Sequence, residues 1–266
     1  MNARKITIHT LRAMKQRGEK ITALTAYDFF TTKIMDEVGV DLILVGDSLG
    51  MAVLGYENTL RVTMEEMVHH TRAVARAKPN ALVVADMPFL TYSTAKEALQ
   101  NAGTFIRAGA EAVKMEGGES IIEQVRALVA AGIPVLGHIG LLPQSILEIG
   151  GYRIQGRKPG SAGRLLQDAK QLESAGAFAI VIECVVAEVA AAIAKAISVP
   201  TIGIGAGADC DGQILVSNDM LGEFTWFTPK HVKRYANLAE EMRKAFSAYK
   251  SEVESGRFPT SEHSFH

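Results

Sequence analysis

Three acidic side chains, Asp47, Asp86 and Glu116, each stand at the end of a short and mostly apolar run of residues. Such runs are typical of buried parallel strands, and the carboxyl ends of neighbouring parallel strands meet at one edge of a sheet. Carboxylates gathered there without a counter-charge repel one another, so the cluster predicts a bound cation. Because every ligand is an oxygen atom, a hard cation such as Mg²⁺ is favoured over zinc.

Other polar side chains end neighbouring runs of the same kind. Side chains two positions apart on a strand share a face, so Lys114 is expected beside Glu116, and Asp47 on the face of Val45. Lys114 could neutralise a substrate carboxylate or form a salt bridge to one of the acids, and both interpretations stay open. His138 ends the fifth run and is expected at the same mouth, although a single histidine in an apolar strand is commonly a satisfied core group.

Glu183 lies within residues 178–187, whose other members are all apolar. Burying a carboxylate without a partner is costly, so Glu183 is expected to face a polar pocket, to pair with a cation or to hold a proton. The neighbouring Cys184 points to the opposite face and is expected to pack. One acid at a strand end is most often a cap or turn residue, but acids on successive strands favour a shared site.

A cation held by three carboxylates keeps open positions for water and a substrate. A 2-oxo acid could chelate it through the carboxylate and keto oxygens, and the cation would then lower the cost of forming an enolate. Ser48, next to Asp47, could bind the same carboxylate through its hydroxyl or backbone N–H. The glycine-rich residues 203–207 are expected to shape a pocket wall, and residues 150–157 to form a lid, a binding loop or an oligomer contact.

Apolar runs and helical patterns alternate along the chain. The predicted strands are residues 21–27, 41–48, 81–88, 112–117, 133–139, 177–184, 200–205 and 213–217. The predicted helices are residues 10–17, 63–77, 94–107, 120–130, 165–174 and 186–197. Eight such alternations predict an α/β fold, a closed (β/α)₈ TIM barrel, with an open doubly wound sheet as the competitor.

The C-terminal part of the chain differs from this pattern. Residues 221–227 have no clear assignment, and residues 229–255 predict a long charged helix with one apolar face. That helix could close the barrel or pack against a neighbouring subunit. Without a linker or low-complexity segment, residues 1–266 are interpreted as one barrel domain with an N-terminal helix and a C-terminal helical extension.

Composition excludes several classes of function. The 266 residues carry a formal net charge of −1 without a long basic run, which argues against binding nucleic acid. Apolar stretches fall short of the roughly 18 residues of a membrane span. Cys184 and Cys210 are too few for a disulfide framework, so we expect reduced thiols and a cytoplasmic protein.

Six motifs, in this order, resemble the ketopantoate hydroxymethyltransferase family. They are Val45-Gly-Asp-Ser-Leu-Gly50, Ala85-Asp-Met-Pro-Phe89, Val113-Lys-Met-Glu-Gly-Gly118, Gly137-His-Ile-Gly140, Gly150-Gly-Tyr-Arg-Ile-Gln-Gly156 and Gly203-Ile-Gly-Ala-Gly207. The resemblance covers nearly the whole chain. It departs at Leu142, where a threonine is expected before Pro-Gln-Ser, and that position lies beside the expected pocket.

The resemblance implies a barrel of the phosphoenolpyruvate/pyruvate type and a Mg²⁺-dependent aldol-type transfer. A hydroxymethyl unit would move from the co-substrate 5,10-methylenetetrahydrofolate to 3-methyl-2-oxobutanoate, giving 2-dehydropantoate for pantothenate synthesis. The family's metal-associated acids match Asp47, Asp86 and Glu116. Its oxo-acid contacts match Asp47, Ser48, Asp86 and Lys114, a pocket histidine matches His138, and its proton acceptor matches Glu183. The resemblance also implies a large homo-oligomer, a homodecamer.

Two other functions stay open. A carbon–carbon lyase of the isocitrate-lyase or phosphonopyruvate type would use similar acids on a similar barrel, but usually with a reactive cysteine on a mobile loop beside Lys and His. Cys210, in Ala208-Asp-Cys-Asp-Gly212, lacks that company. A non-catalytic barrel that binds oxo acids could share the metal site but would have no need of Glu183.

Overall fold

The computed structural model describes residues 4–151, 153–224 and 229–265. By its internal contacts the chain divides into two compact units, Met1–Val216 and Ser217–His266. Two segments considered in the sequence analysis are only partly covered, because Tyr152 and residues 225–228 lie outside the described residues.

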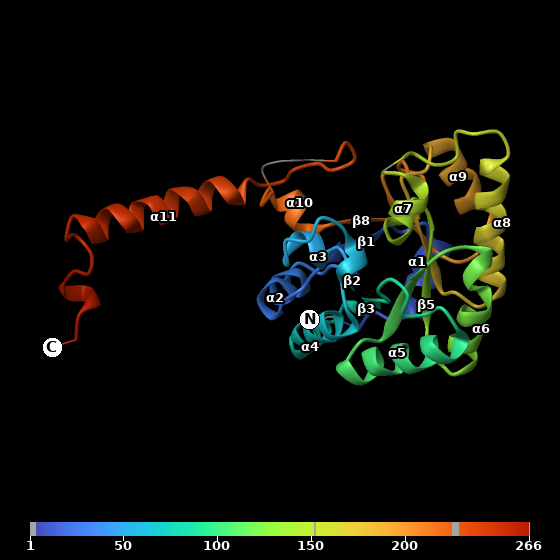
Figure 1. Ribbon diagram of the computed structural model, residues 1–266, viewed down its shortest axis with the longest axis horizontal. Helices are drawn as coiled ribbons and strands as arrows, with labels where there is room; N and C mark the ends of the chain where they lie inside the picture. The colour runs from blue at the N-terminus through green and yellow to red at the C-terminus, as the bar shows by residue number, and fades with distance from the viewer. Residues whose placement is uncertain (1–3, 152, 225–228, 266) are drawn as a thin grey trace. The chain divides into compact units, whose positions relative to one another are not determined.

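In the described part of the first unit, eight parallel strands form a closed barrel (Figure 1). The strands are β1 (Ile21–Thr25), β2 (Leu42–Val45), β3 (Leu82–Asp86), β4 (Ala112–Glu116), β5 (Val135–Gly140), β6 (Ala179–Glu183), β7 (Thr201–Ile204) and β8 (Gly212–Leu215). Each strand pairs with the next in sequence, and β8 pairs with β1. The predicted closed (β/α)₈ barrel is confirmed, and an open sheet is excluded.

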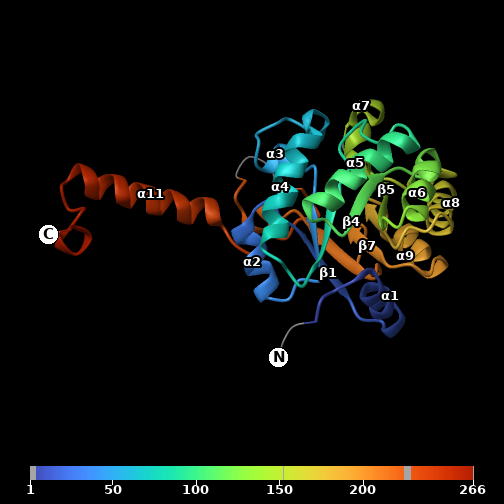
Figure 2. The same cartoon turned by 90° about the horizontal axis from the view of Figure 1, so that it is seen from below.

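Alternate side chains of the strands face opposite sides of the barrel wall. Leu44 and Val84 belong to the cluster that fills the barrel, whereas Val45 belongs to a second cluster between the strands and the surrounding helices. Leu11 and Met14, from α1 (Ile8–Arg17), join the interior cluster. The N-terminal helix therefore packs against the barrel core, and Figure 2 shows it beside the start of β1.

Helices surround the barrel wall (Figure 2). They are α2 (Phe29–Glu37), α3 (Leu49–Ala52), α4 (Met64–Arg76), α5 (Ala95–Ala108), α6 (Ile122–Ala130), α7 (Ile146–Ile149), α8 (Ser161–Ser174) and α9 (Ala187–Ala196), with 3₁₀ turns η1 (Thr59–Arg61), η2 (Glu119–Ile121) and η3 (Pro143–Ser145). Thr63 and Thr94 begin α4 and α5 with capping boxes, which fixes both helix starts where the sequence predicts them.

The second unit contains α10 (Ser217–Leu221), α11 (Leu238–Glu254) and a 3₁₀ turn, η4 (Ser261–His263). The sequence predicts one helix over residues 229–255, but α11 begins only at Leu238, after turns and extended chain. None of the residues of α11 is buried. In the part of the chain that the structure describes, we find no helix with both the length and the apolar character that crossing a membrane requires.

Candidate active site

The polar side chains singled out in the sequence meet at the carboxyl-terminal mouth of the barrel. Asp86, Glu116 and Glu183 are the last residues of β3, β4 and β6. Lys114 stands two residues before Glu116 on β4, and His138 lies on β5 beside it in register. These strands continue the inward-facing rows of the interior cluster, so strand periodicity alone carries the polar groups into the mouth.

Asp47 reaches the same place by a different route. The prediction that it shares a face with Val45 is wrong, because Val45 packs outward against the helices. The strand β2 ends at Val45, and the chain then turns, with the Leu49 N–H donating to the Gly46 carbonyl at 3.1 Å. A Cβ atom on Gly46 would lie only 2.8 Å from Ser48 Oγ, so this tight turn favours glycine. The turn, rather than strand parity, directs Asp47 into the mouth.

The three predicted metal-associated acids form a compact buried cluster. One carboxylate oxygen from each of Asp47, Asp86 and Glu116 lies within 4.8 Å of the other two. Lys114 Nζ donates to both oxygens of Asp86, at 2.9 and 2.7 Å, and to Glu116 Oε1 at 3.2 Å. The predicted salt bridge between Lys114 and the acids is therefore present.

Ionisation in this cluster follows from burial and mutual repulsion. Burial raises the pKa of Asp47 well above its usual range, and the charges of Asp86 and Glu116 raise it further. Burial would also raise the pKa of Glu116, but Lys114 and His138 outweigh it and hold the value at about 2. Burial opposes the charge of Lys114, yet the surrounding carboxylates hold its pKa well above the ordinary value. The cluster thus holds a fixed ammonium and a surplus of negative charge.

His138 connects this cluster with Glu183. Its Nδ1 lies 3.2 Å from Glu116 Oε1 and its Nε2 lies 3.2 Å from Glu183 Oε2. Neither ring nitrogen is aligned for a regular hydrogen bond with a described residue. Burial and Lys114 lower the pKa of His138, but the two flanking carboxylates raise it to about 9, so the ring is cationic at neutral pH. Glu183 keeps 16% of its side chain exposed and remains accessible from the mouth.

Gln144 is the polar group at this site that the sequence analysis missed. Its Nε2 donates to Asp47 Oδ2 at 3.0 Å and to the Met87 carbonyl at 2.9 Å, and its backbone N–H donates to Glu116 Oε2 at 3.1 Å. Tyr92 OH donates to Gln144 Oε1 at 2.6 Å and so fixes which end of the amide faces Asp47. The available signal was Pro143-Gln-Ser145, directly after Leu142, the one departure noted in the family motifs.

Ser48 lies at the edge of the cluster rather than in it. It is half-buried, and its hydroxyl shares a hydrogen bond of 2.9 Å with the hydroxyl of Tyr27. The Asp47 backbone N–H donates weakly to Asp86 Oδ2, at 3.4 Å. The turn that carries Asp47 therefore also carries Ser48, whose hydroxyl is held by Tyr27.

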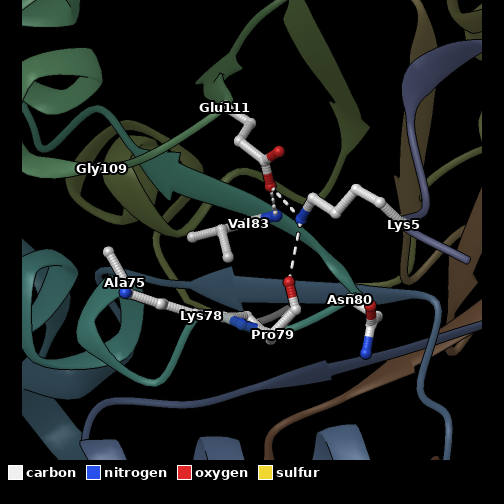
Figure 3. A pocket seen from close by; sticks show the side chains of 8 residues that line it. All are labelled: Lys5, Ala75, Lys78, Pro79, Asn80, Val83, Gly109 and Glu111. Atoms are coloured by element: carbon white, nitrogen blue, oxygen red, sulfur yellow. Dashed lines mark hydrogen bonds and ion pairs between the residues drawn. The ribbon is translucent and has the colours of Figure 1, made fainter. Parts of the chain in front are cut away.

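Another cavity lies at the opposite end of the strands. This cavity of about 390 Å³ is bordered by the residues that precede β3 and β4 (Figure 3). Lys5 Nζ crosses it and donates to the carbonyls of Pro79 and Ala81 and to Glu111 Oε2. Glu111 Oε2 also accepts the Val83 N–H at 3.0 Å. Through these bonds Lys5 holds the N-terminal segment against the barrel. This role is a stabilising one, because in barrels of this type the chemistry takes place at the opposite end of the strands.

The glycine segment at residues 203–207 and the two cysteines have packing roles. A Cβ atom on Gly207 would lie 2.7 Å from Ala187 Cβ, so the glycine allows close contact with the start of α9. Cys184 and Cys210 are free thiols. Burial raises the pKa of Cys184 to about 11 and also raises that of Cys210. Neither thiol has the lowered pKa that is typical of a nucleophile, which disfavours the lyase alternative with its reactive cysteine.

The barrel and its buried carboxylates fit the class of barrel enzymes whose strand ends could hold a divalent metal ion. The model of the family described as "Ketopantoate hydroxymethyltransferase" matches residues 5–261. Two similar proteins are the 3-methyl-2-oxobutanoate hydroxymethyltransferases of Syntrophus aciditrophicus, 56% identical (98% of this chain, 97% of the relative), and of Clostridium novyi, 57% identical (98% and 96%). The chain therefore belongs to the ketopantoate hydroxymethyltransferase family, a family of transferases.

Solved structures agree on the architecture. A phosphonopyruvate hydrolase solved with oxalate and Mg²⁺ has a TM-score of 0.63 at 16% identity, covering 97% of this chain and 93% of its own. A 2,3-dimethylmalate lyase of the PEP mutase/isocitrate lyase superfamily has a TM-score of 0.60 at 14% identity, covering 97% and 91%. At these identities the likeness establishes the shared barrel fold, as the sequence predicts, and leaves the reaction to the family and the site.

Proposed function

We propose that this enzyme transfers a hydroxymethyl unit from 5,10-methylenetetrahydrofolate to 3-methyl-2-oxobutanoate, giving 2-dehydropantoate for pantothenate synthesis. Its family membership supports the reaction. The single observation that carries the assignment of roles is the continuous series of contacts from Asp86 through Lys114, Glu116 and His138 to Glu183. That series connects an acid cluster suited to a cation with a carboxylate suited to proton removal.

The residues present fit a divalent cation. Asp47, Asp86 and Glu116 offer oxygen donors from three strand ends, and hard cations such as Mg²⁺ take oxygen ligands. The raised pKa of Asp47 reflects negative charge that a cation would neutralise. When bound, such a cation supplies Lewis acidity that polarises the keto group and acidifies the neighbouring C–H. We assign the three carboxylates as its ligands, directly or through water.

The remaining side chains bind and orient the oxo acid. Lys114 is a buried cation beside the acids, so it can turn one of its N–H groups to the substrate carboxylate while it stays paired with Asp86, which thereby helps to position that contact. The Ser48 hydroxyl can share in holding that carboxylate. The acid cluster is nearly inaccessible to water. An oxo acid bound against it would therefore have its C3–H bond shielded from solvent.

Glu183 is the group that we assign to remove the proton from C3 of the oxo acid. It is the most accessible acid of the site, and its Oε2 is held by His138 at 3.2 Å, which orients the carboxylate toward the mouth. The resulting carbon nucleophile attacks the one-carbon unit of the folate as its methylene iminium. One water is consumed overall, and the products are the hydroxymethylated oxo acid and tetrahydrofolate.

The test uses the first half of the reaction by itself. With Mg²⁺ and 3-methyl-2-oxobutanoate in D₂O, the parent enzyme should exchange the C3 hydrogen in the absence of folate, as followed by proton NMR. Glu183→Gln should keep oxo-acid binding and lose most of this exchange, about 10²–10⁴-fold for a general base. A variant that exchanges as fast as the parent would show that another group takes the proton. Binding by the parent without any exchange would favour the oxo-acid-binding barrel.

We propose a homo-oligomer, a homodecamer, for the assembled enzyme, acting in the cytoplasm as a single barrel domain with a C-terminal helical extension. The support is α11, which exposes apolar side chains on one face, at Met242, Phe246, Tyr249 and Val253, with 46–64% of each residue accessible. An apolar helix face of this length is typical of a surface that a neighbouring subunit covers. Light scattering coupled to size exclusion gives the mass, and a monomer would contradict the proposal.

A further inference from the structure

A second pocket adjoins the acid cluster on the side of β3 and β4. It has a volume of about 240 Å³ and opens between the loop after β3, the start of α6 and the loop after β5. Phe89, Tyr92 and Ile121 give it apolar and aromatic walls. Two members of the acid site, Glu116 and Gln144, also form its wall, so a molecule bound here would lie next to the oxo-acid site.

Gln124, which lines this pocket, holds a buried hydrogen-bond acceptor without a partner among the described residues. The residue lines the pocket from α6 and is only 8% exposed. Its Nε2 donates to the Ser93 carbonyl at 3.3 Å, which directs the amide. Its Oε1 is buried and has no hydrogen-bond partner in residues 4–151, 153–224 and 229–265. An unpaired buried acceptor destabilises a folded protein by roughly 1–3 kcal/mol, and a ligand N–H that met it after a small rotation of the Gln124 side chain would remove that cost.

The charge and bonding of the walls limit what can bind. Tyr92 OH already donates to Gln144, and the Gln144 amide is fully used, so the remaining polar groups of the wall are the Gln124 acceptor and the hydroxyls of Ser120 and Ser145. Glu116 adds negative charge on one side. An oxo acid at neutral pH is an anion without N–H or O–H donors, so this wall would disfavour it. A flat, uncharged heterocycle with N–H groups on its edge would stack on the aromatic side chains and satisfy Gln124.

We propose that this pocket binds the pteridine ring of the folate co-substrate, an inference that rests on the proposed function. The amino-oxopyrimidine edge of that ring presents N–H donors, and its two fused rings are flat. The volume is below the roughly 300–1,000 Å³ of pockets that enclose drug-sized ligands, so the ring enters and the rest of the folate extends outward. The common wall at Glu116 and Gln144 places the one-carbon unit beside the oxo acid.

Gln124→Leu tests the pocket because it keeps the size of the side chain and removes the acceptor. Isothermal titration with 5-formyltetrahydrofolate, in the presence of Mg²⁺ and oxo acid, should show about tenfold weaker affinity, the loss of one hydrogen bond to a buried group. The KM for 5,10-methylenetetrahydrofolate should rise by a similar factor, so the loss falls on the folate step rather than on C3 exchange. Ser120→Trp, from the exposed rim, should obstruct the pocket and weaken folate binding more than tenfold.

The matched control is Gln171→Leu. Gln171, on α8, also has a buried Oε1 without a partner in the described chain, but it does not line the pocket. It should leave folate affinity and KM unchanged. If both pocket variants bind 5-formyltetrahydrofolate as the parent does while C3 exchange is intact, the pocket assignment is overturned and the proposed function stands. If the parent shows neither exchange nor transfer, the proposed function fails, and the pocket assignment fails with it.

Discussion

Lys114→Met removes the ammonium group between Asp86 and Glu116 and keeps the length of the side chain. In the parent this group makes contacts of 2.7–3.2 Å with the two acids, and the side chains involved are at most 5% exposed. Removing one partner of a buried ion pair costs about 3–5 kcal/mol, because the remaining charge is left without compensation. For a chain of this size that corresponds to a fall in Tm of roughly 6–20 °C.

The structure also predicts how the loss of stability of Lys114→Met depends on Mg²⁺ and on pH. A divalent cation would neutralise part of the surplus negative charge, so Mg²⁺ should raise the Tm of Lys114→Met more than that of the parent. Without the ammonium, the already raised pKa values of Asp47 and Asp86 rise further above those of the unfolded chain, and the pKa of Glu116 rises from its lowered value. Protonation then relieves the repulsion, so the deficit measured in EDTA should be largest near neutral pH and shrink as the pH falls.

Differential scanning fluorimetry in EDTA and in Mg²⁺ measures both effects. Lys15→Met is the matched control, because Lys15 forms a partly buried ion pair with Asp211 at 2.9 Å outside the acid cluster. Its Tm should fall, but by the same amount with and without Mg²⁺. A Lys114→Met protein that melts within about 2 °C of the parent in EDTA, or that gains no more from Mg²⁺ than the Lys15 variant, would refute the charge argument.

Three further results are expected. Asp86→Asn should weaken Mg²⁺-dependent binding of the oxo acid in calorimetry, and an unchanged Mg²⁺ requirement would argue against ligation by Asp86. Gln144→Leu removes the amide that orients Asp47, so Mn²⁺ affinity measured by electron paramagnetic resonance should fall about 10–100-fold, while an unchanged affinity would limit Gln144 to packing. In EDTA, the stability that His138 contributes should be complete below its ordinary pKa of 6.5 and decline as the pH rises through about 9, by a few kcal/mol. His138→Gln should remove that dependence from denaturant titrations, and an unchanged pH profile would contradict a cationic ring.

The barrel was predictable because most of its strands, such as β2 and β3, are buried on both faces. Their sequences are nearly continuous apolar runs, which are typical of parallel strands covered on both sides. The predicted ends extend too far, as in residues 41–48 against Leu42–Val45, because glycine and aspartate of the following turn continue the pattern. The helix α2 was not predicted. Its apolar residues, such as Phe30 at 72% exposed, are not confined to a buried face, so its periodicity is weak.

The site shows a similar division. The alternation of side chains along a strand places Lys114 and Glu116 on the same face correctly, because both belong to one regular strand, β4. The same rule fails for Asp47, since the strand ends before it and the turn at residues 46–49 sets its direction. Gln144 could not be found by parity at all, because its contacts depend on where η3 lies after β5. A period-two pattern describes direction within a strand and carries no information about the loops beyond it.

The position of Lys114 bears on the two interpretations that the sequence left open. Ion pairing with the acids and binding of a substrate carboxylate are not exclusive, because an ammonium group has three donors and Lys114 uses them on two carboxylates. A cation bound by those carboxylates would weaken their hold on the lysine at the moment that an anionic substrate arrives. Lys114 would then exchange one of its partners for the substrate without moving into water.

The order of charges along the mouth extends this argument to the base. From Asp86 to Glu183 the side chains alternate in sign, with Lys114 and His138 as the cations between acids. Neutralising Asp86 and Glu116 would weaken their hold on Lys114, whereas His138 would lose part of its attraction to Glu116 and keep Glu183 as its second partner. Glu183 therefore keeps an oriented partner while the cluster exchanges its own. If Glu183 is the base, as we propose, its place on β6 at the end of this series puts His138 between it and the nearest proposed cation ligand, Glu116.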